Sequence, residues 1–168
     1  MPIYHELRKK HTEDAILVIP PHFSDEEIED LYGDISEFSV IKDTHEALLQ
    51  ADFAYVCSGT ATLECSLIGT PMVLVFRASR LEYWIGRKFV KLKHVGLANI
   101  IFDFSKESGA FDGKDEMHTE LLQEEVNVQR MYEVYKNIDK KKVLEGSIEL
   151  RKNLDKNRSK DVTEIVLR

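Results

Sequence analysis

The sequence predicts an α/β fold in which a Rossmann-like parallel sheet is flanked by helices. Short apolar runs rich in branched and aromatic residues alternate with segments of helical periodicity, as in a doubly wound sheet. The helical segments carry boundary signals, because Ser24 and Asp43 begin capping-box patterns and Gly69 with Pro71 ends a helix. With 168 residues, the chain is long enough for one compact core.

The first half of the chain supplies the expected sheet. Strands are expected at 15–19, 38–41, 52–57 and 72–76. Helices are expected at 2–11, 24–33, 43–50 and from the turn at 58–60 to Gly69. A βα fold begins with a strand, whereas this chain begins with a helix, so we expect a domain that lacks its first strand.

The second half is expected to be mainly helical. An amphipathic helix over 80–93 precedes a turn and a short apolar run at 96–101, and residues 102–117 are typical of an exposed loop. Further helices are expected at 119–125, 127–137, 141–154 and 160–167. We therefore expect an N-terminally truncated Rossmann-like domain over 1–140 and a helical C-terminal tail over 141–168.

Composition excludes several classes of protein and site. The net charge of −7 argues against a general nucleic-acid binder, so no nucleic-acid partner is expected. No apolar run reaches the ~20 residues that span a bilayer, and residues 1–10 lack the apolar core of a signal peptide. Cys57 and Cys65 have neither a metal-site nor a disulfide spacing, so we expect both thiols to be buried in a protein of the reducing cytoplasm. The histidines have no metal-ligand spacing either, so we expect no metal and no cofactor.

One stretch has the features of an anion site: the apolar run 52–57, the turn Ser58-Gly59-Thr60 and the helix that follows. In a parallel sheet, such a unit presents free backbone N–H groups and the positive end of a helix at the carboxyl edge, where anionic ligands bind. Ser58, Gly59 and Thr60 are therefore candidate phosphate ligands, although such residues most often form only a turn and a helix cap.

Glu64 is a candidate ligand in the same helix. An acid near a helix start is usually a member of a capping box, but that box needs Ser or Thr three residues earlier, where this chain has Ala61. A carboxylate at the edge of a nucleotide site instead accepts hydrogen bonds from the ribose hydroxyls. Both interpretations stay open at this point.

Two further polar residues are candidates at this edge of the sheet. Arg77 follows the strand 72–76, a position from which it can reach a phosphate or pair with an acid. Asn99 lies in the expected loop after 80–93, where a side-chain amide often only caps a turn. The sequence has no Walker loop, nucleophile elbow or GxGxxG fingerprint.

The segment Arg80–Lys93 combines basic and aromatic residues. Its most distinctive side chains are Trp84, Arg87, Lys88, Phe89 and Lys91. An amphipathic helix packed on the sheet is the simpler interpretation. The alternative is a helix lying on an anionic membrane surface, for which basic residues beside Trp and Phe are typical.

Several of these motifs together resemble the donor-binding C-terminal half of lipid-A-disaccharide synthase, a glycosyltransferase family of the GT-B fold. The shared motifs are Ser58–Glu64, Gly69–Val73, Phe76–Arg77, Trp84–Lys91, Val95–Ile101 and Glu120–Glu125. The Ser-Gly-Thr core with Glu64 is shared more loosely by many GT-B enzymes. The stretch from Trp84 to Asn99 is more specific to this family.

The resemblance implies a bacterial cytoplasmic enzyme that binds peripherally to the inner membrane and can form a homodimer. It implies transfer of 2,3-diacylglucosamine from its UDP-linked form to 2,3-diacylglucosamine 1-phosphate, the lipid X type of acceptor, with inversion and release of UDP. The implied UDP-sugar contacts are Ser58, Gly59, Thr60, Glu64, Arg77 and Asn99, with the backbone near Ile41 at the uracil edge. The implied lipid contacts are Trp84, Arg87, Lys88, Phe89 and Lys91.

The resemblance also implies parts that this chain lacks. The family's Leu-Pro-Gly-Ser-Arg loop and the acceptor domain with its general base have no counterpart here, so catalytic residues are unknown and we expect the chain alone to be inactive. The family's Leu-Pro-Asn is Leu97-Ala98-Asn99, and residues 105–117 are expected to be an insertion. The alternatives are another GT-B enzyme, such as a UDP-N-acetylglucosamine 2-epimerase, and a non-catalytic module that binds membrane or a partner through Arg80–Lys93.

Overall fold

The computed structural model describes residues 2–57, 60–78, 94–104 and 116–166. The expected helix over 80–93 and most of the expected loop over 102–117 lie outside these residues. The described elements are α1 (Ile3–Arg8), β1 (Ile16–Val18), α2 (Asp25–Tyr32), β2 (Ser39–Ile41), α3 (Thr44–Gln50), β3 (Ala54–Val56), α4 (Thr60–Ile68), β4 (Met72–Phe76), α6 (Leu97–Phe104), β5 (Thr119–Leu122), η1 (Gln123–Glu125), α7 (Val128–Asn137) and α8 (Lys140–Val166).

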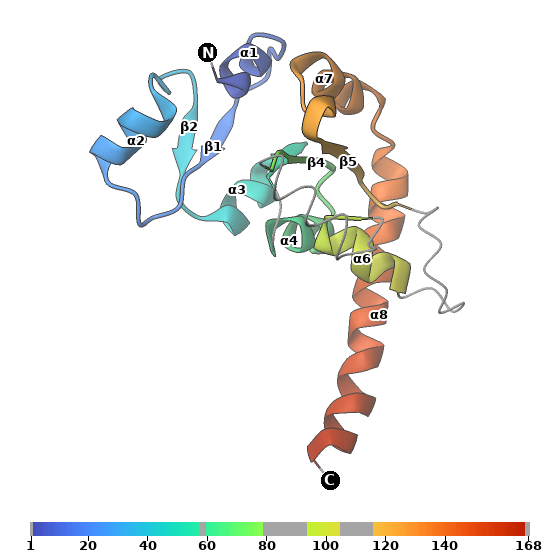
Figure 1. The fold of residues 1–168 in the computed structure, drawn as a ribbon. Helices are drawn as coiled ribbons and strands as arrows, with labels where there is room; N and C mark the ends of the chain where they lie inside the picture. Colours follow the sequence, from blue (N-terminus) through green and yellow to red (C-terminus); the bar gives the residue numbers. More distant parts are fainter. Residues whose placement is uncertain (1, 58–59, 79–93, 105–115, 167–168) are drawn as a thin grey trace.

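The described strands all pair in parallel, which confirms the predicted α/β fold class. They form two sheets, one of order β1-β2 and one of order β3-β4-β5. Figure 1 shows β1, β2 and α2 on one side of the molecule, β4, β5 and α7 on the other, and α3 between them. Because parallel strands need crossover connections, each strand returns through a helical segment and the carboxyl ends in a sheet share one edge.

Helices cover both faces of the three-stranded sheet. Successive side chains of a strand point to opposite faces, and β4 is buried on both, as its continuous apolar sequence predicts. On one face, α1 and α7 pack against the sheet through the cluster Leu7, Val73, Val75, Leu121, Val126 and Met131. On the other face, α3, α4 and α6 form the cluster Leu48, Val56, Cys65, Met72 and Ala98.

The first half of α8 belongs to this core. Val143 and Leu150 are buried against Phe102 of α6 and Met117. Arg151 donates from Nε to Leu67 O at 2.6 Å and from Nη2 to Ile68 O at 3.0 Å. These carbonyls lie at the C-terminal end of α4, where a helix leaves its last acceptors without internal partners. Figure 1 shows the second half of α8 extending away from the sheets to the C-terminus.

The two N-terminal caps that the sequence predicts are both present. Ser24 and Glu27 form a complete capping box, with Ser24 Oγ accepting from Glu27 N at 3.3 Å and Glu27 Oε2 accepting from Ser24 N at 2.9 Å. Asp43 Oδ1 accepts from Glu46 N at 3.0 Å. Glu46 does not complete the second box, since its carboxylate accepts from Gln50 Nε2 at 3.4 Å instead.

Three expectations for the second half are wrong. The expected helix over 119–125 is strand β5 followed by the short η1, because pairing with the buried β4 outweighs the helix propensity of Glu, Leu and Gln. The expected turn and apolar run at 96–101 form α6, which buries Ala98 and Phe102 on one helical face. The helices expected at 141–154 and 160–167 are one helix, α8, since no Gly or Pro interrupts the sequence between them.

A chain of buried polar groups connects β5 to α4. Ser66 Oγ donates to Thr62 O at 2.7 Å and lies 2.8 Å from Nε2 of His118, the residue just before β5. Because the Ser66 hydroxyl has one proton, His118 Nε2–H donates to it, and His118 Nδ1 finds no partner among the described residues. Burial lowers the pKa of His118 to about 4, so the imidazole is neutral at pH 7.

We expect His118 to weaken the fold in mild acid. The unfolded chain binds a proton at the ordinary imidazole pKa of about 6.5, whereas the folded chain holds the pKa at about 4. The stability from neutral His118 is therefore fully present above about pH 6.5 and is lost as the pH falls toward 4. Urea unfolding at pH 7.5 and pH 5 should show roughly 2 kcal/mol of loss from this group.

His118→Gln is the control for this prediction. Its amide keeps a hydrogen-bond donor for Ser66 but does not titrate, so its free energy of unfolding should fall by about 2 kcal/mol less than that of the unchanged chain. An equal pH dependence in the two proteins would contradict the role given to His118.

We expect Arg151→Ala to lower the free energy of unfolding by about 1 kcal/mol, because Ile68 O loses its donor and Leu67 O keeps only the long bond from Ser147 Oγ at 3.4 Å. Urea unfolding at pH 7.5 measures the change. Lys152→Ala removes the same charge from the exposed neighbouring position of α8 and should change stability by less than about 0.5 kcal/mol. Equal losses in the two variants would show that charge alone, and not the cap, is responsible.

Candidate functional site

The predicted anion site lies where β3 ends and α4 begins. Val56 is buried at the end of β3, and Thr60 is exposed at the start of α4. Ser58 and Gly59 lie outside the described residues. Because α4 follows β3 directly, its positive end lies at the carboxyl edge of the β3-β4-β5 sheet, which is the location that the anion-site hypothesis requires.

Gly69 ends α4, which confirms the predicted glycine stop. Its φ of +92° lies in the left-handed region, and its N–H and that of Thr70 both donate to Cys65 O, at 3.0 and 3.1 Å. Thr70 Oγ1 also donates to Leu48 O at 3.0 Å. This bond holds the C-terminal end of α4 against α3 and thereby helps to fix the position of the two helices relative to each other.

Glu64 lies on α4 with 37% of its side chain exposed. Its Oε1 accepts from His45 Nδ1 at 3.1 Å, and His45 lies in the first turn of α3. No sequence signal points to His45, because the capping pattern that begins at Asp43 already explains its position. The structure therefore adds one polar residue from a second helix to the predicted site.

The two cysteines differ in environment. Cys65 is buried in α4, and this burial, together with the neighbouring Glu64 charge, raises the pKa of its thiol to about 12. Cys57 is exposed. The prediction that both thiols are buried is therefore wrong for Cys57, which follows β3 at the open carboxyl edge of the sheet.

Arg77 is held by backbone carbonyls at the carboxyl end of the sheet. It donates from Nε to Gln123 O at 3.2 Å and from Nη2 to Val126 O at 2.6 Å. These bonds tie the end of β4 to the segment that follows β5. In this arrangement Arg77 shapes the edge of the site through the backbone.

The side chain of Gln123 adds a second contact between the end of β4 and the segment that follows β5. With its amide oriented to satisfy both partners, Gln123 donates to Ala78 O at 3.2 Å and accepts from Ala78 N at 3.3 Å. Its φ of +53° is in the left-handed region, which is costly for a residue other than glycine. Sequence reasoning missed this clamp, since a glutamine in a helix-forming stretch gives no signal for it.

Asn99 is buried in α6, so its expected position in a loop is wrong. Its Oδ1 accepts from Met117 N at 2.9 Å and His118 N at 3.0 Å. Its Nδ2 donates to His118 O and to Glu120 Oε1, both at 2.8 Å. All four hydrogen-bonding positions of the amide are thus used within the protein, and Asn99 connects α6 to β5.

Glu120 of β5 holds the start of α6. Its carboxylate accepts from Val95 N at 2.7 Å and Gly96 N at 3.1 Å, in addition to the bond from Asn99. His94 Nδ1 lies 3.7 Å from the same carboxylate, and both side chains are only 6% exposed. Gln123 binds Ala78 and Glu120 binds residues 95 and 96, so β5 and η1 anchor the described residues on both sides of the segment 79–93.

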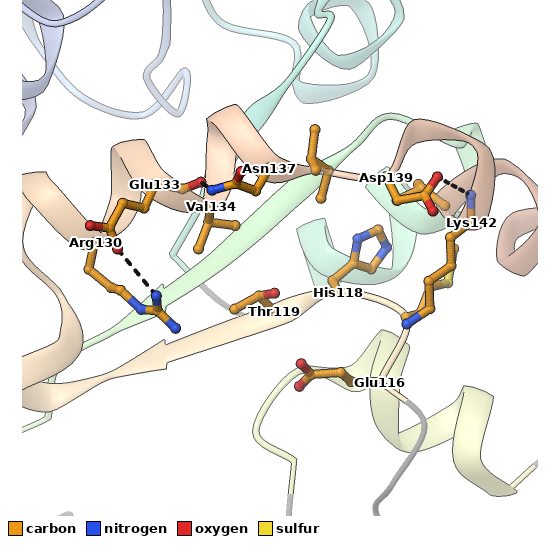
Figure 2. Close-up of a pocket in the computed structure, with 12 residues that line it drawn as sticks. Glu116, His118, Thr119, Arg130, Glu133, Val134, Asn137, Asp139 and Lys142 are labelled. Atoms are coloured by element: carbon orange, nitrogen blue, oxygen red, sulfur yellow. Dashed lines mark hydrogen bonds and ion pairs between the residues drawn. The ribbon is translucent and has the colours of Figure 1, made fainter.

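A separate pocket of about 320 Å³ opens at the other end of β5. Figure 2 shows it between the start of β5, α7 and the start of α8, with Arg130, Glu133 and His118 among its lining side chains. No residue of the predicted UDP-sugar site lines this pocket. It lies at the amino end of the strand, whereas Thr60, Glu64 and His45 gather at the carboxyl edge.

Two further features concern the described residues alone. Within them, no three His, Cys, Asp or Glu side chains come together in a group that could hold a metal ion. No helix in the same part of the chain has the length and apolar content needed to cross a membrane.

The chain is similar to known proteins over most of its length. The model of the family "LpxB: Lipid-A-disaccharide synthetase" matches residues 5–164. A lipid-A-disaccharide synthase of Campylobacter jejuni (strain RM1221) is 48% identical over 141 residues, which cover 84% of this chain and 36% of that protein. The synthases of Helicobacter acinonychis and Helicobacter pylori (strain Shi470) are each 39% identical over 140 residues, covering 83% of this chain and 39% of each relative.

This chain therefore spans little more than a third of the length of these relatives. Within that span, the family match covers the anion-site unit, the anchors on β5 and most of α8. These matches confirm the resemblance that the motifs indicate, and the chain belongs to the lipid-A-disaccharide synthetase family.

Proposed function

We propose that this chain is the donor-nucleotide-binding half of a lipid-A-disaccharide synthase. The enzyme is an inverting glycosyltransferase that moves 2,3-diacylglucosamine from its UDP-linked form to 2,3-diacylglucosamine 1-phosphate and releases UDP. Family membership supports glycosyl transfer in lipid A biosynthesis. The β3–α4 unit supports a nucleotide diphosphate site, because the start of a helix at the carboxyl edge of a parallel sheet favours phosphate.

The partly exposed carboxylate of Glu64 is the observation that carries the proposal. Thr60 begins α4 at the edge of the sheet, and Glu64 follows about one helical turn later. In the proposed site, Ser58, Gly59 and Thr60 bind the diphosphate, and Glu64 accepts hydrogen bonds from the ribose hydroxyls. The uracil lies near the backbone of Ile41, at the end of β2.

Arg77 and Asn99 act indirectly in this proposal. The guanidinium of Arg77 and the amide of Asn99 are engaged by groups of the protein itself. They support donor binding because Arg77 fixes the end of β4 to the segment that follows β5, and Asn99 fixes the start of α6 to β5. No catalytic residue is assigned within this chain, and the proposed site needs no metal or cofactor.

The family match favours this function over the two alternatives from the sequence. A UDP-N-acetylglucosamine 2-epimerase has the same kind of nucleotide site, but the matched family and the relatives are lipid-A-disaccharide synthases. A module that only binds membrane or a partner has no use for the partly exposed carboxylate of Glu64 beside the carboxyl edge of the sheet.

We also propose that the enzyme is peripheral on the cytoplasmic face of the inner membrane. The basic and aromatic composition of Arg80–Lys93 supports this location, since such segments bind anionic lipid. The residues that flank the segment, Ala78 and Val95, are fixed to β5 and η1. This attachment gives a lipid-bound segment a firm connection to the donor site.

We expect Glu64→Ala to weaken binding of UDP to the full-length protein at least tenfold, because hydrogen bonds from the ribose to a charged group contribute about 1.5–3 kcal/mol. Isothermal titration calorimetry with UDP measures the change. Glu46→Ala removes another exposed acid, from α3, and should leave the affinity unchanged. If Glu64→Ala binds UDP as well as the unchanged protein, Glu64 is not the ribose ligand.

We expect replacement of Arg87, Lys88 and Lys91 by Gln to weaken binding to anionic phospholipid vesicles about 100-fold, since each basic residue near such a surface contributes about 1 kcal/mol. Vesicle sedimentation of the full-length protein measures it. The control replaces Lys140, Lys141 and Lys142 at the start of α8 by Gln, which removes the same charge elsewhere. Equal weakening by the two sets would indicate a general charge effect and would contradict a specific role of Arg80–Lys93.

A further inference from the structure

His45 and Glu64 form a hydrogen bond between two helices that both begin at carboxyl ends of strands. α3 follows β2, α4 follows β3, and His45 Nδ1 lies 3.1 Å from Glu64 Oε1. The side chain of His45 is 60% exposed and that of Glu64 is 37% exposed, so neither is enclosed by the core. Their mutual bond therefore adds a specific restriction on the orientation of both side chains.

The chemistry of the two groups sets the direction of this bond. An ionised carboxylate only accepts hydrogen bonds, so the imidazole carries its proton on Nδ1 and donates it to Oε1. Among the described residues, Glu64 Oε2 receives no hydrogen bond. One oxygen of Glu64 is thus occupied by His45, and the other remains available as an acceptor.

The backbone that carries His45 is well fixed. Asp43 Oδ1 caps the start of α3 through Glu46 N at 3.0 Å, and Ala47 and Leu48 bury the inner side of the helix. Thr70 Oγ1, just after α4, holds Leu48 O at 3.0 Å. The imidazole therefore approaches Glu64 from a position that the fold has already determined.

We propose that His45 is a positioning residue for the donor ribose. It holds Oε1 of Glu64 so that Oε2 is presented to the ribose hydroxyls, and it thereby favours a ribonucleoside diphosphate over the 2′-deoxy analogue. This inference rests on the proposed function, because it takes Glu64 as the ribose ligand. A side chain that is already held loses less conformational entropy when the ligand binds, which is the physical gain from His45.

The preference for ribose over deoxyribose is the property that isolates this role. A site built to pair with a hydroxyl group rejects the analogue that lacks it, since the acceptor is then left without its partner. Loss of general stability lowers the affinities for both nucleotides together. Loss of Glu64 orientation lowers the affinity for UDP more than that for 2′-deoxy-UDP.

The test measures the affinities of UDP and 2′-deoxy-UDP for the full-length protein by isothermal titration calorimetry. We expect His45→Ala to reduce the preference for UDP about threefold, the size typical of an exposed hydrogen-bonded pair. His45→Asn should keep the preference within about twofold, because Asn Nδ2 and His Nδ1 are both bonded to Cγ and can donate from the same place. Glu64→Ala should abolish the preference.

Lys141→Ala is the matched control, since it breaks an exposed pair with Glu145 on α8, where the two groups lie 3.8 Å apart. It should leave the preference unchanged, and thermal unfolding of each variant checks that the protein is folded.

If His45→Ala keeps the full preference while Glu64→Ala abolishes it, His45 has no positioning role and the proposed function stands. If neither variant alters the preference, the ribose contact of Glu64 is wrong, and this inference fails with it. If His45→Asn loses as much as His45→Ala, donation to Glu64 is not the mechanism.

Discussion

The pairing of β5 with β4 is the constraint on which the arrangement of α4, α6 and the end of β4 depends. β5 carries Glu120, is preceded by His118 and is followed by Gln123, and each of these side chains holds a different element. His118 connects to α4, Glu120 to the start of α6, and Gln123 to the end of β4. If β5 were a helix, these side chains would point in other directions and the three elements would lose their common attachment.

The first half of the chain could be predicted from sequence because its signals are local. Ser24 and Glu27 form their capping box between residues only three positions apart, and Gly69 adopts the positive φ that a glycine stop requires. β4 is a continuous apolar run, which a buried parallel strand needs. In such segments, the physical forces that decide the structure act within one helical turn or one strand.

Prediction failed where a distant partner decides the outcome. Residues 119–122 have good helix formers, and only the buried neighbour β4, more than forty residues earlier in the chain, makes them a strand. Asparagine is a residue type typical of turns, yet the amide of Asn99 is bonded to Met117, His118 and Glu120 inside the protein. The position of His45 beside Glu64 depends on how α3 packs against α4, and no spacing along the chain encodes that.

The side chains of β5, η1 and α6 also divide the long connection between β4 and β5 into shorter pieces. Gln123 and Glu120 hold residues 78 and 95–96, and Asn99 holds residues 117 and 118, so the segments between these points are closed separately. The entropy of closing a flexible loop grows only with the logarithm of its length, and doubling a loop costs about 0.6 kcal/mol. Because the bonds from Asn99 to Met117 and His118 close one of these pieces on their own, a change of chain length between residues 99 and 117 is separated from the residues that flank the donor site.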